Sequence, residues 1–165
     1  MSQQQIFVTG LTVVDTTRRE KLGAIRWVNN KAYKYVKYNS GTGPVAAAAA
    51  AVAVYHGDNG WDDSEVSCDY TDGVVVAGVL IGAPANAGFG WMQIKGECTA
   101  LAVAIEASND ATPVTCADGD PVVRGDADKA LRRNNTVVDA DAEVLPIVGI
   151  AIDASAKLVL LDCPF

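Results

Sequence analysis

The chain contains 165 residues, half of them apolar, and its 20 acidic residues outnumber its 13 basic ones, which leaves a net charge of −7. This length suits one domain with a sizeable core, and the negative charge argues against nucleic acid as a direct partner. The longest apolar run, residues 45–55, is mostly alanine and too short to cross a bilayer, so we expect no membrane association. The opening MSQQQIF lacks the basic and apolar regions of a signal peptide, and we expect no secretion by the usual route.

Residues 1–22 are predicted to form an N-terminal arm. The segment is polar apart from an apolar patch at residues 6–14, and it ends in a basic cluster made of Arg18, Arg19 and Lys21. Such a terminus stays poorly ordered unless contacts hold it to the domain. The rest of the chain, residues 23–165, is predicted to be a β domain.

The first predicted element of this domain is a hairpin. Residues 24–28 indicate one strand, residues 29–31 a turn, and residues 33–38 a second strand in which aromatic and basic residues partly alternate. Two asparagines between β-prone runs are typical of a tight hairpin turn. Residues 40–44, rich in glycine and proline, then end the second strand.

Two segments of unusual composition follow. The alanine-rich residues 45–54 favour a helix by propensity and a strand in their second half, so we interpret them as a turn or short helix that leads into a strand. Residues 57–72 contain six acidic residues and no basic one. This composition predicts an acidic loop insertion on the surface, with one short strand at residues 66–70.

Strands and turns dominate the remainder. Residues 73–82, 89–96 and 99–105 are predicted to form a three-stranded meander, with a turn at residues 84–88. The rest comprises polar turns at 108–120, a short strand at 122–123, a loop or brief helical turn at 127–132 within 124–143, and closing strands at 144–152 and 157–161. We therefore predict an all-β fold, a small sandwich or barrel of short antiparallel strands with an extended N-terminal arm.

Four cysteines are spread along the chain, at positions 68, 98, 116 and 163, and no two of them form a CxxC pair. This spacing excludes a zinc knuckle and a thioredoxin-like motif. The even number permits two disulfides. Because no signal peptide is expected, four reduced thiols are the favoured interpretation, each acting as a small hydrophobic residue beside a strand.

No recognisable catalytic motif is present in the sequence. His56 is the single histidine, and nucleophilic catalysis needs such a base oriented by a carboxylate, but a structural histidine at a strand end is the favoured interpretation. The acidic residues 58–65 lack the alternating ligand spacing of a calcium loop, and paired carboxylates such as Asp62 and Asp63 show no sign of a cleft. We expect no catalytic residue, no metal and no cofactor, and we predict that the chain is not an enzyme.

Charged and aromatic residues are distributed unevenly. Positions 18–37 hold seven basic residues and one acid, whereas positions 57–72 hold six acids and no Lys or Arg. Opposed patches of this kind favour contacts between copies or with a charged partner, although ordinary solvated faces are the commoner case. Trp91 is expected in the core, and Trp61 in the acidic loop either meets a partner or packs onto its own domain.

Three groups of motifs carry a family resemblance. Residues 22–27 (LGAIRW) and 31–39 (KAYKYVKYN), followed by the alanine-rich stretch, resemble the opening of many capsid decoration, or cement, proteins of tailed bacteriophages. Residues 78–82 (GVLIG) and 88–96 (GFGWMQIKG) look like the glycine–aromatic core hairpin of that family. Residues 148–155 and 158–161 are similar to its closing strands.

The resemblance implies a structural virion protein that binds the outside of an icosahedral phage head and stabilises the lattice by bridging neighbouring major capsid subunits. It also implies a homodimer or homotrimer on the capsid exterior, assembled in the host cytoplasm, with N-terminal arms that reach across the shell. The residues expected to contact the capsid or another partner are Ile6, Phe7, Leu11, Arg18, Arg19, Lys21 and Trp61. Two alternatives stay open, a receptor-binding head-fibre or tail-spike module and a small β-fold hydrolase that uses the acidic loops.

Overall fold

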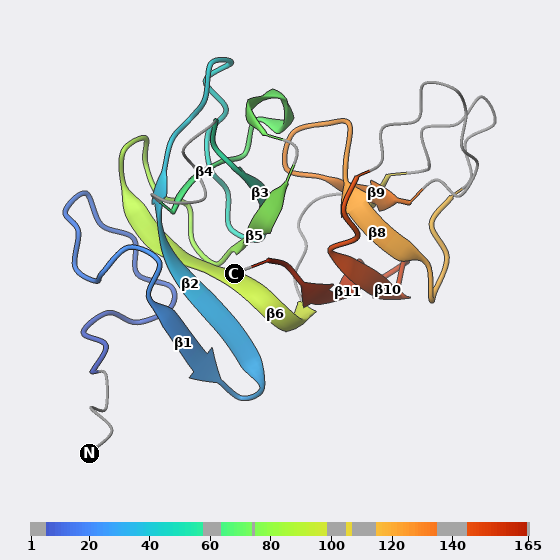
Figure 1. The fold of residues 1–165 in the computed structure, drawn as a ribbon, viewed down its shortest axis with the longest axis horizontal. Coiled ribbons are helices and arrows are strands. Elements are labelled where there is room, and N and C mark those ends of the chain that lie inside the picture. The colour runs from blue at the N-terminus through green and yellow to red at the C-terminus, as the bar shows by residue number, and fades with distance from the viewer. Residues whose placement is uncertain are drawn as a thin grey trace.

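Figure 1 shows the fold in a computed structural model, which describes residues 6–57, 64–73, 75–98, 105–106, 115–134 and 145–164. Within these residues the chain is all-β, with eleven strands, one short 3₁₀ helix and no α-helix. No helix in this part of the chain has the length and apolar character needed to span a membrane. The elements are β1 (Ile25–Val28), β2 (Lys31–Tyr38), β3 (Val52–Tyr55), β4 (Glu65–Ser67), η1 (Tyr70–Asp72), β5 (Val76–Leu80), β6 (Phe89–Cys98), β7 (Ile105–Glu106), β8 (Pro121–Arg124), β9 (Leu131–Arg133), β10 (Gly149–Asp153) and β11 (Leu158–Asp162).

Five strands close into a barrel in the order β2, β4, β3, β5 and β6, because β6 also pairs with β2. The β2–β4 pair is parallel, and the other four barrel pairs are antiparallel. In Figure 1 the long strands β2 and β6 lie side by side along one wall. The predicted all-β class is therefore confirmed, and its architecture is a closed barrel with additional strands.

β6 is long enough to take part in a second group of strands. Its last four residues pair with β11, and the pairing continues through β10, β8, β9 and β7. β5 and β6 pair as predicted for the meander. Residues 99–104 of its third predicted strand lie outside the described residues, and Ile105 belongs to β7, which pairs with β9 rather than with β6.

The hairpin predicted near the N-terminus is confirmed. β1 and β2 pair in antiparallel register from Ile25↔Lys34 to Val28↔Lys31, which leaves two residues in the turn. Asn29 and Asn30 have φ values of 49° and 63°, the left-handed conformation that a two-residue hairpin turn requires at both positions. Asparagine tolerates this conformation better than most residues, so the local sequence determines the register.

Small residues let the barrel strands approach closely. Ala51 and Ala53 are fully buried, and a Cβ added at Gly78 of β5 would lie 2.5 Å from a backbone carbonyl oxygen of β6. Larger side chains such as Met92 and Ile94 fill the interior, and burying each contributes about 1.5–3 kcal/mol. The alanine-rich segment thus forms a turn that leads into β3, one of the two predicted forms.

Two predictions for the second half of the chain are wrong. The closing strand predicted at residues 144–152 is absent at residues 145–148, and β10 begins only at Gly149. The loop or helical turn expected at residues 127–132 consists of bends and turns only as far as Lys129, and Leu131 begins strand β9. Leu131 is buried, and the Arg132 guanidinium lies 3.4 Å from the Asp126 carboxylate. The charged residues of this segment are therefore held in a strand by burial and ion pairing, which their composition does not reveal.

The acidic loop and the cysteines are described in part. Within residues 57–72, the predicted strand corresponds to β4, while residues 58–63, with Trp61, lie outside the described residues. All four cysteines are free and buried. Burial raises the pKa of Cys68 to about 11 and that of Cys163 to about 12, so both thiols stay protonated at neutral pH.

Candidate functional site

Residues 6–22 lie against the outer face of β2 and β6. Phe7 and Leu11 pack on a cluster formed by Tyr33, Tyr35 and Trp91, which face away from the barrel interior. The Phe7 and Trp91 rings meet edge to face, with centroids 5.4 Å apart. Residues 6–22 thus cover apolar side chains of β2 and β6 that would otherwise face water.

A buried carboxylate holds this segment in a loop. Oε1 of Glu20 accepts hydrogen bonds from the backbone N–H of Val8 at 2.8 Å, the N–H of Thr9 at 2.9 Å and the Thr9 hydroxyl at 3.0 Å. The Thr9 hydroxyl in turn accepts a bond from Nε1 of Trp91 at 3.0 Å. One side chain thus links residues 8 and 9 to residue 20, and the indole of the outer cluster joins the same network.

A second attachment lies midway along the segment. Asp15 and Phe89 exchange backbone hydrogen bonds of 3.0 and 2.8 Å, and the N–H of Arg19 donates to the Tyr35 hydroxyl at 3.3 Å. A Cβ at Gly82 would lie 2.6 Å from the Val14 side chain, so a glycine is needed where the segment crosses the barrel. The glycines that frame the predicted core hairpin therefore have a packing role that the sequence pattern alone does not assign.

The predicted partner-binding residues divide into two groups. Phe7 and Leu11 are half-buried and pack on the outer cluster, which holds the segment to the barrel. Ile6 is 81% exposed, and Arg18, Arg19 and Lys21 are also exposed. Trp61 lies outside the described residues. The structure thus leaves one apolar and three basic residues of the prediction on the surface.

Three exposed or partly exposed residues in the first 27 positions were not predicted as contacts. Val8 is 72% exposed, and Trp27 on β1 is 59% exposed. Arg26 lies over the Phe7 ring, 5.5 Å from its centroid, and donates from Nη1 to the Thr9 carbonyl oxygen at 3.0 Å. We name the surface formed by Ile6, Val8, Arg18, Arg19 and Lys21 the N-terminal surface; Trp27 projects from the opposite face of the hairpin, because it pairs with Ala32 whereas Arg26 pairs with Tyr33.

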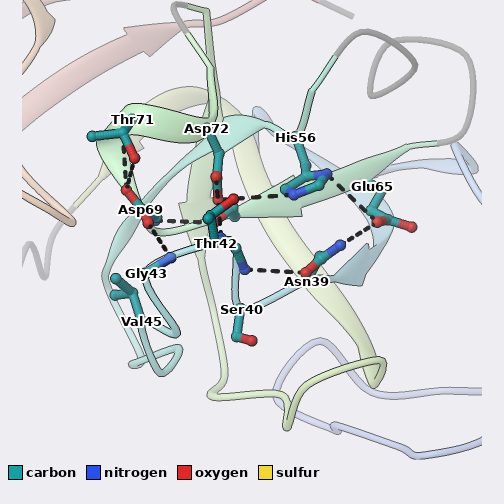
Figure 2. A network of polar contacts seen from close by, with 12 residues as sticks. Asn39, Ser40, Thr42, Gly43, Val45, His56, Glu65, Asp69, Thr71 and Asp72 are labelled. Carbon is teal, nitrogen blue, oxygen red and sulfur yellow. Dashed lines mark hydrogen bonds and ion pairs between the residues drawn. The ribbon is translucent and has the colours of Figure 1, made fainter.

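A separate polar network surrounds His56 at the end of β3, as Figure 2 shows. Nδ1 of the imidazole lies 3.7 Å from the Glu65 carboxylate, and Nε2 lies 3.8 Å from Oδ2 of Asp72. The side chain of Asp72 is only 6% exposed, and its other oxygen accepts a bond from the N–H of Thr42 at 3.4 Å. The predicted position of His56 at a strand end is confirmed, and two carboxylates lie beside its ring.

Two carboxylates of this network, those of Glu65 and Asp69, have lowered pKa values. Burial raises the pKa of Glu65, but hydrogen bonds from Lys37 at 2.8 Å and Asn39 at 2.7 Å outweigh it, so the pKa is lowered. The hydroxyl and N–H of Thr71 lower the pKa of Asp69, which also accepts a bond from the N–H of Gly43. These bonds tie the loop after β2 to β4 and η1.

The network has the composition of a structural junction. No serine or cysteine side chain among the described residues hydrogen-bonds to His56, so the imidazole has no nucleophile to activate there. A pocket of about 330 Å³ lies beside the same loop, but its lining includes Pro44, Ala47 and Pro84 and no carboxylate. The parts of a hydrolytic site are therefore not gathered at this end of the barrel in the described residues.

One buried amine was not anticipated by the sequence analysis. Lys34 of β2 is 5% exposed, and its Nζ donates to the Tyr55 hydroxyl at 2.9 Å and lies 4.8 Å from the centre of that ring. Burial lowers the pKa of Lys34 and raises that of Tyr55 to about 12. Lys34 is buried because β2 is covered on both faces, by the barrel interior and by residues 6–22.

No family model, curated protein or solved structure matches this chain. The functional argument therefore depends on the surfaces and networks described above.

Proposed function

We propose that this chain is a structural virion protein that binds the outside of an icosahedral phage head and bridges neighbouring major capsid subunits. The observation that supports the proposal is the N-terminal surface, where exposed Ile6 and Val8 lie on a segment that Glu20 and Trp91 fix to the barrel. Large exposed apolar side chains on a fixed backbone are typical of protein contact sites. The motif resemblance to capsid decoration proteins supplies the identity of the partner.

Charge adds support for an acidic partner surface. Seven of the 13 basic residues lie at positions 18–37, in a chain whose net charge is −7. The one acid in that stretch, Glu20, is buried against Thr9, and among the exposed cations Arg19 lies 3.8 Å from the Asp15 carboxylate. Attachment through Arg18 and Lys21 would weaken as ionic strength rises, because exposed charges are screened.

On a capsid lattice, even weak contacts between each bound chain and the shell are enough to stabilise the shell. A protein that binds the assembled shell and not free subunits stabilises the shell by mass action. Symmetry repeats each contact, and a dimer or trimer of the bound chain adds avidity. Homo-oligomerisation is thus part of the proposal, and direct contact with nucleic acid or membrane is not.

The test is the copy number of the chain in purified particles, measured by quantitative mass spectrometry against the major capsid protein. We expect a ratio near one or a simple fraction of one. A few copies per particle would refute lattice decoration in favour of a head-fibre or tail-spike module, and absence from particles would refute a virion role. Ile6→Asp should weaken attachment, whereas Val13→Asp, on the same segment but outside the named surface, should not.

A further inference from the structure

β1 has an open edge. It pairs with β2 and stands at the end of the strand order, and no other described strand lies beside it. The backbone N–H of Tyr35 donates to the Ala24 carbonyl at 3.0 Å, so Ala24 and Tyr35 form a hydrogen-bonded pair at the start of the β1–β2 ladder. Hydrogen-bonded pairs alternate along an antiparallel ladder, so Arg26 and Val28 face β2 while the N–H and C=O groups of Ile25 and Trp27 point away from it.

This edge lacks the usual protection. Native edges are commonly blocked by proline, by a bulge or by a charged side chain. β1 contains no proline, its register against β2 is regular, and its one charge, Arg26, is engaged with Phe7 and Thr9. Trp27 is 59% exposed, and no backbone hydrogen bond among the described residues engages its outward N–H and C=O groups.

We propose that the open edge of β1 binds an extended acidic segment of a partner as an added strand. The exposed cations Arg18, Arg19 and Lys21 belong to the segment that leads directly into β1, and Lys31 follows it across the hairpin turn. A second copy pairing β1 against β1 would bring these same cations together, which disfavours self-association at this edge. A strand carrying carboxylates meets the opposite charge and satisfies the free backbone groups.

The length of β1 limits how many residues of the partner strand can pair with it. The outward N–H and C=O groups of Ile25 and Trp27 are two residues apart along β1. An added strand of about four to six residues is therefore long enough to pair with all of them. The side chains of the added strand would alternate between the two faces of the sheet, and those on one face would contact the Trp27 ring. The inference rests on the proposed function only for the partner's identity, the major capsid protein, because an open edge binds an acidic strand wherever that strand comes from.

The test uses the full chain and three synthetic hexapeptides. One alternates valine and glutamate, one alternates valine and lysine, and the third is the valine–glutamate peptide with alternate amides N-methylated. Amide exchange at Ile25 and Trp27 is followed by nuclear magnetic resonance. We expect the first peptide to slow exchange about tenfold at a concentration about nine times its Kd, and the other two to have no effect.

A pair of variants separates the backbone from the ring. Trp27→Pro removes an N–H that faces away from β2 and should abolish the protection, since proline is tolerated at the open side of an edge strand. Trp27→Thr keeps the N–H and should retain most of it. The methylated peptide gives the same comparison without altering the protein, so a folding defect in Trp27→Pro leaves the test intact.

Three results would overturn the inference. Equal protection by the glutamate and lysine peptides would exclude charge selection, and no protection by any peptide would exclude strand addition. Dimerisation in sedimentation experiments that Trp27→Pro abolishes would identify a second copy as the occupant. Peptide binding together with absence of the chain from purified particles would refute the proposed function while leaving the open edge established.

Discussion

Glu20 is predicted to control whether residues 6–22 stay on the barrel. One oxygen of its carboxylate accepts three hydrogen bonds from Val8 and Thr9, and the side chain is buried. Each such bond contributes about 1 kcal/mol net, so Glu20→Ala should lower the free energy of opening this segment by about 3 kcal/mol. Glu20→Gln keeps a neutral acceptor, with bonds about half as strong, and should lose about 1.5 kcal/mol.

Amide hydrogen exchange at Val8 and Thr9 measures this opening directly, because it reports local unfolding separately from global unfolding. The expected losses correspond to exchange that is about 100-fold faster in Glu20→Ala and about tenfold faster in Glu20→Gln. Lys21→Ala, a change at the adjacent exposed position, is the matched control and should leave both amides unchanged. Exchange in Glu20→Ala within about threefold of the parent, at a difference of only about 0.7 kcal/mol, would refute the assigned role of the carboxylate.

Three further outcomes are expected from the fold. Gly78→Ala should destabilise the barrel by about 1–3 kcal/mol in urea titration, because its Cβ would lie 2.5 Å from a backbone oxygen of β6, whereas Gly10→Ala makes only an ordinary 3.6 Å contact and should be near neutral. The lowered pKa of Glu65 stabilises the fold above its ordinary value of 4.5, and this stability is lost as pH falls through the folded pKa; Lys37→Met should flatten that acid limb of the unfolding curve, and an unchanged limb would contradict the assignment. Burial raises the pKa of Cys163 to about 12, so a thiol reagent at pH 7 should label it only after denaturant is added, and rapid labelling of the native protein would contradict its burial.

The hairpin and the all-β class could be predicted because both depend on local signals. Two asparagines between β-prone runs determine the β1–β2 turn, and the glycine-framed strands correspond to β5 and β6. The alanine-rich segment gave two alternatives because alanine favours a helix by propensity. The barrel resolves them, since fully buried Ala51 and Ala53 fit where neighbouring strands come close.

Closure of the barrel could not be predicted from the sequence. It depends on a parallel contact between Lys37–Tyr38 and Glu65–Val66, two short pairs that no local pattern marks. Strand β9 was missed for a similar reason, because Leu131–Arg133 is mostly charged and is stabilised by pairing with β8 and by the 2.8 Å ion pair between Arg133 and Asp120. Long-range side-chain contacts leave no periodicity in a sequence.

The packing of residues 6–22 was also hidden, and it changes how the proposed function should be tested. The apolar patch looked like a free docking arm, yet Phe7 and Leu11 shield Trp91 and Tyr35. Removing residues 1–22 would expose that cluster and destabilise the barrel, so lost particle binding would not separate docking from folding. Point changes at exposed Ile6 or Arg18 keep the cluster covered and test the contact alone.

A fixed segment also binds differently from a disordered one. An arm that folds on the capsid would lose conformational entropy at each attachment, and that cost would reduce the affinity of every copy. Here Glu20, Trp91 and the Asp15–Phe89 backbone pair order the segment before it meets a partner. Under the proposed function, weakening these internal bonds should therefore reduce attachment, and Glu20→Gln should attach more weakly than the parent although its exposed side chains are unchanged.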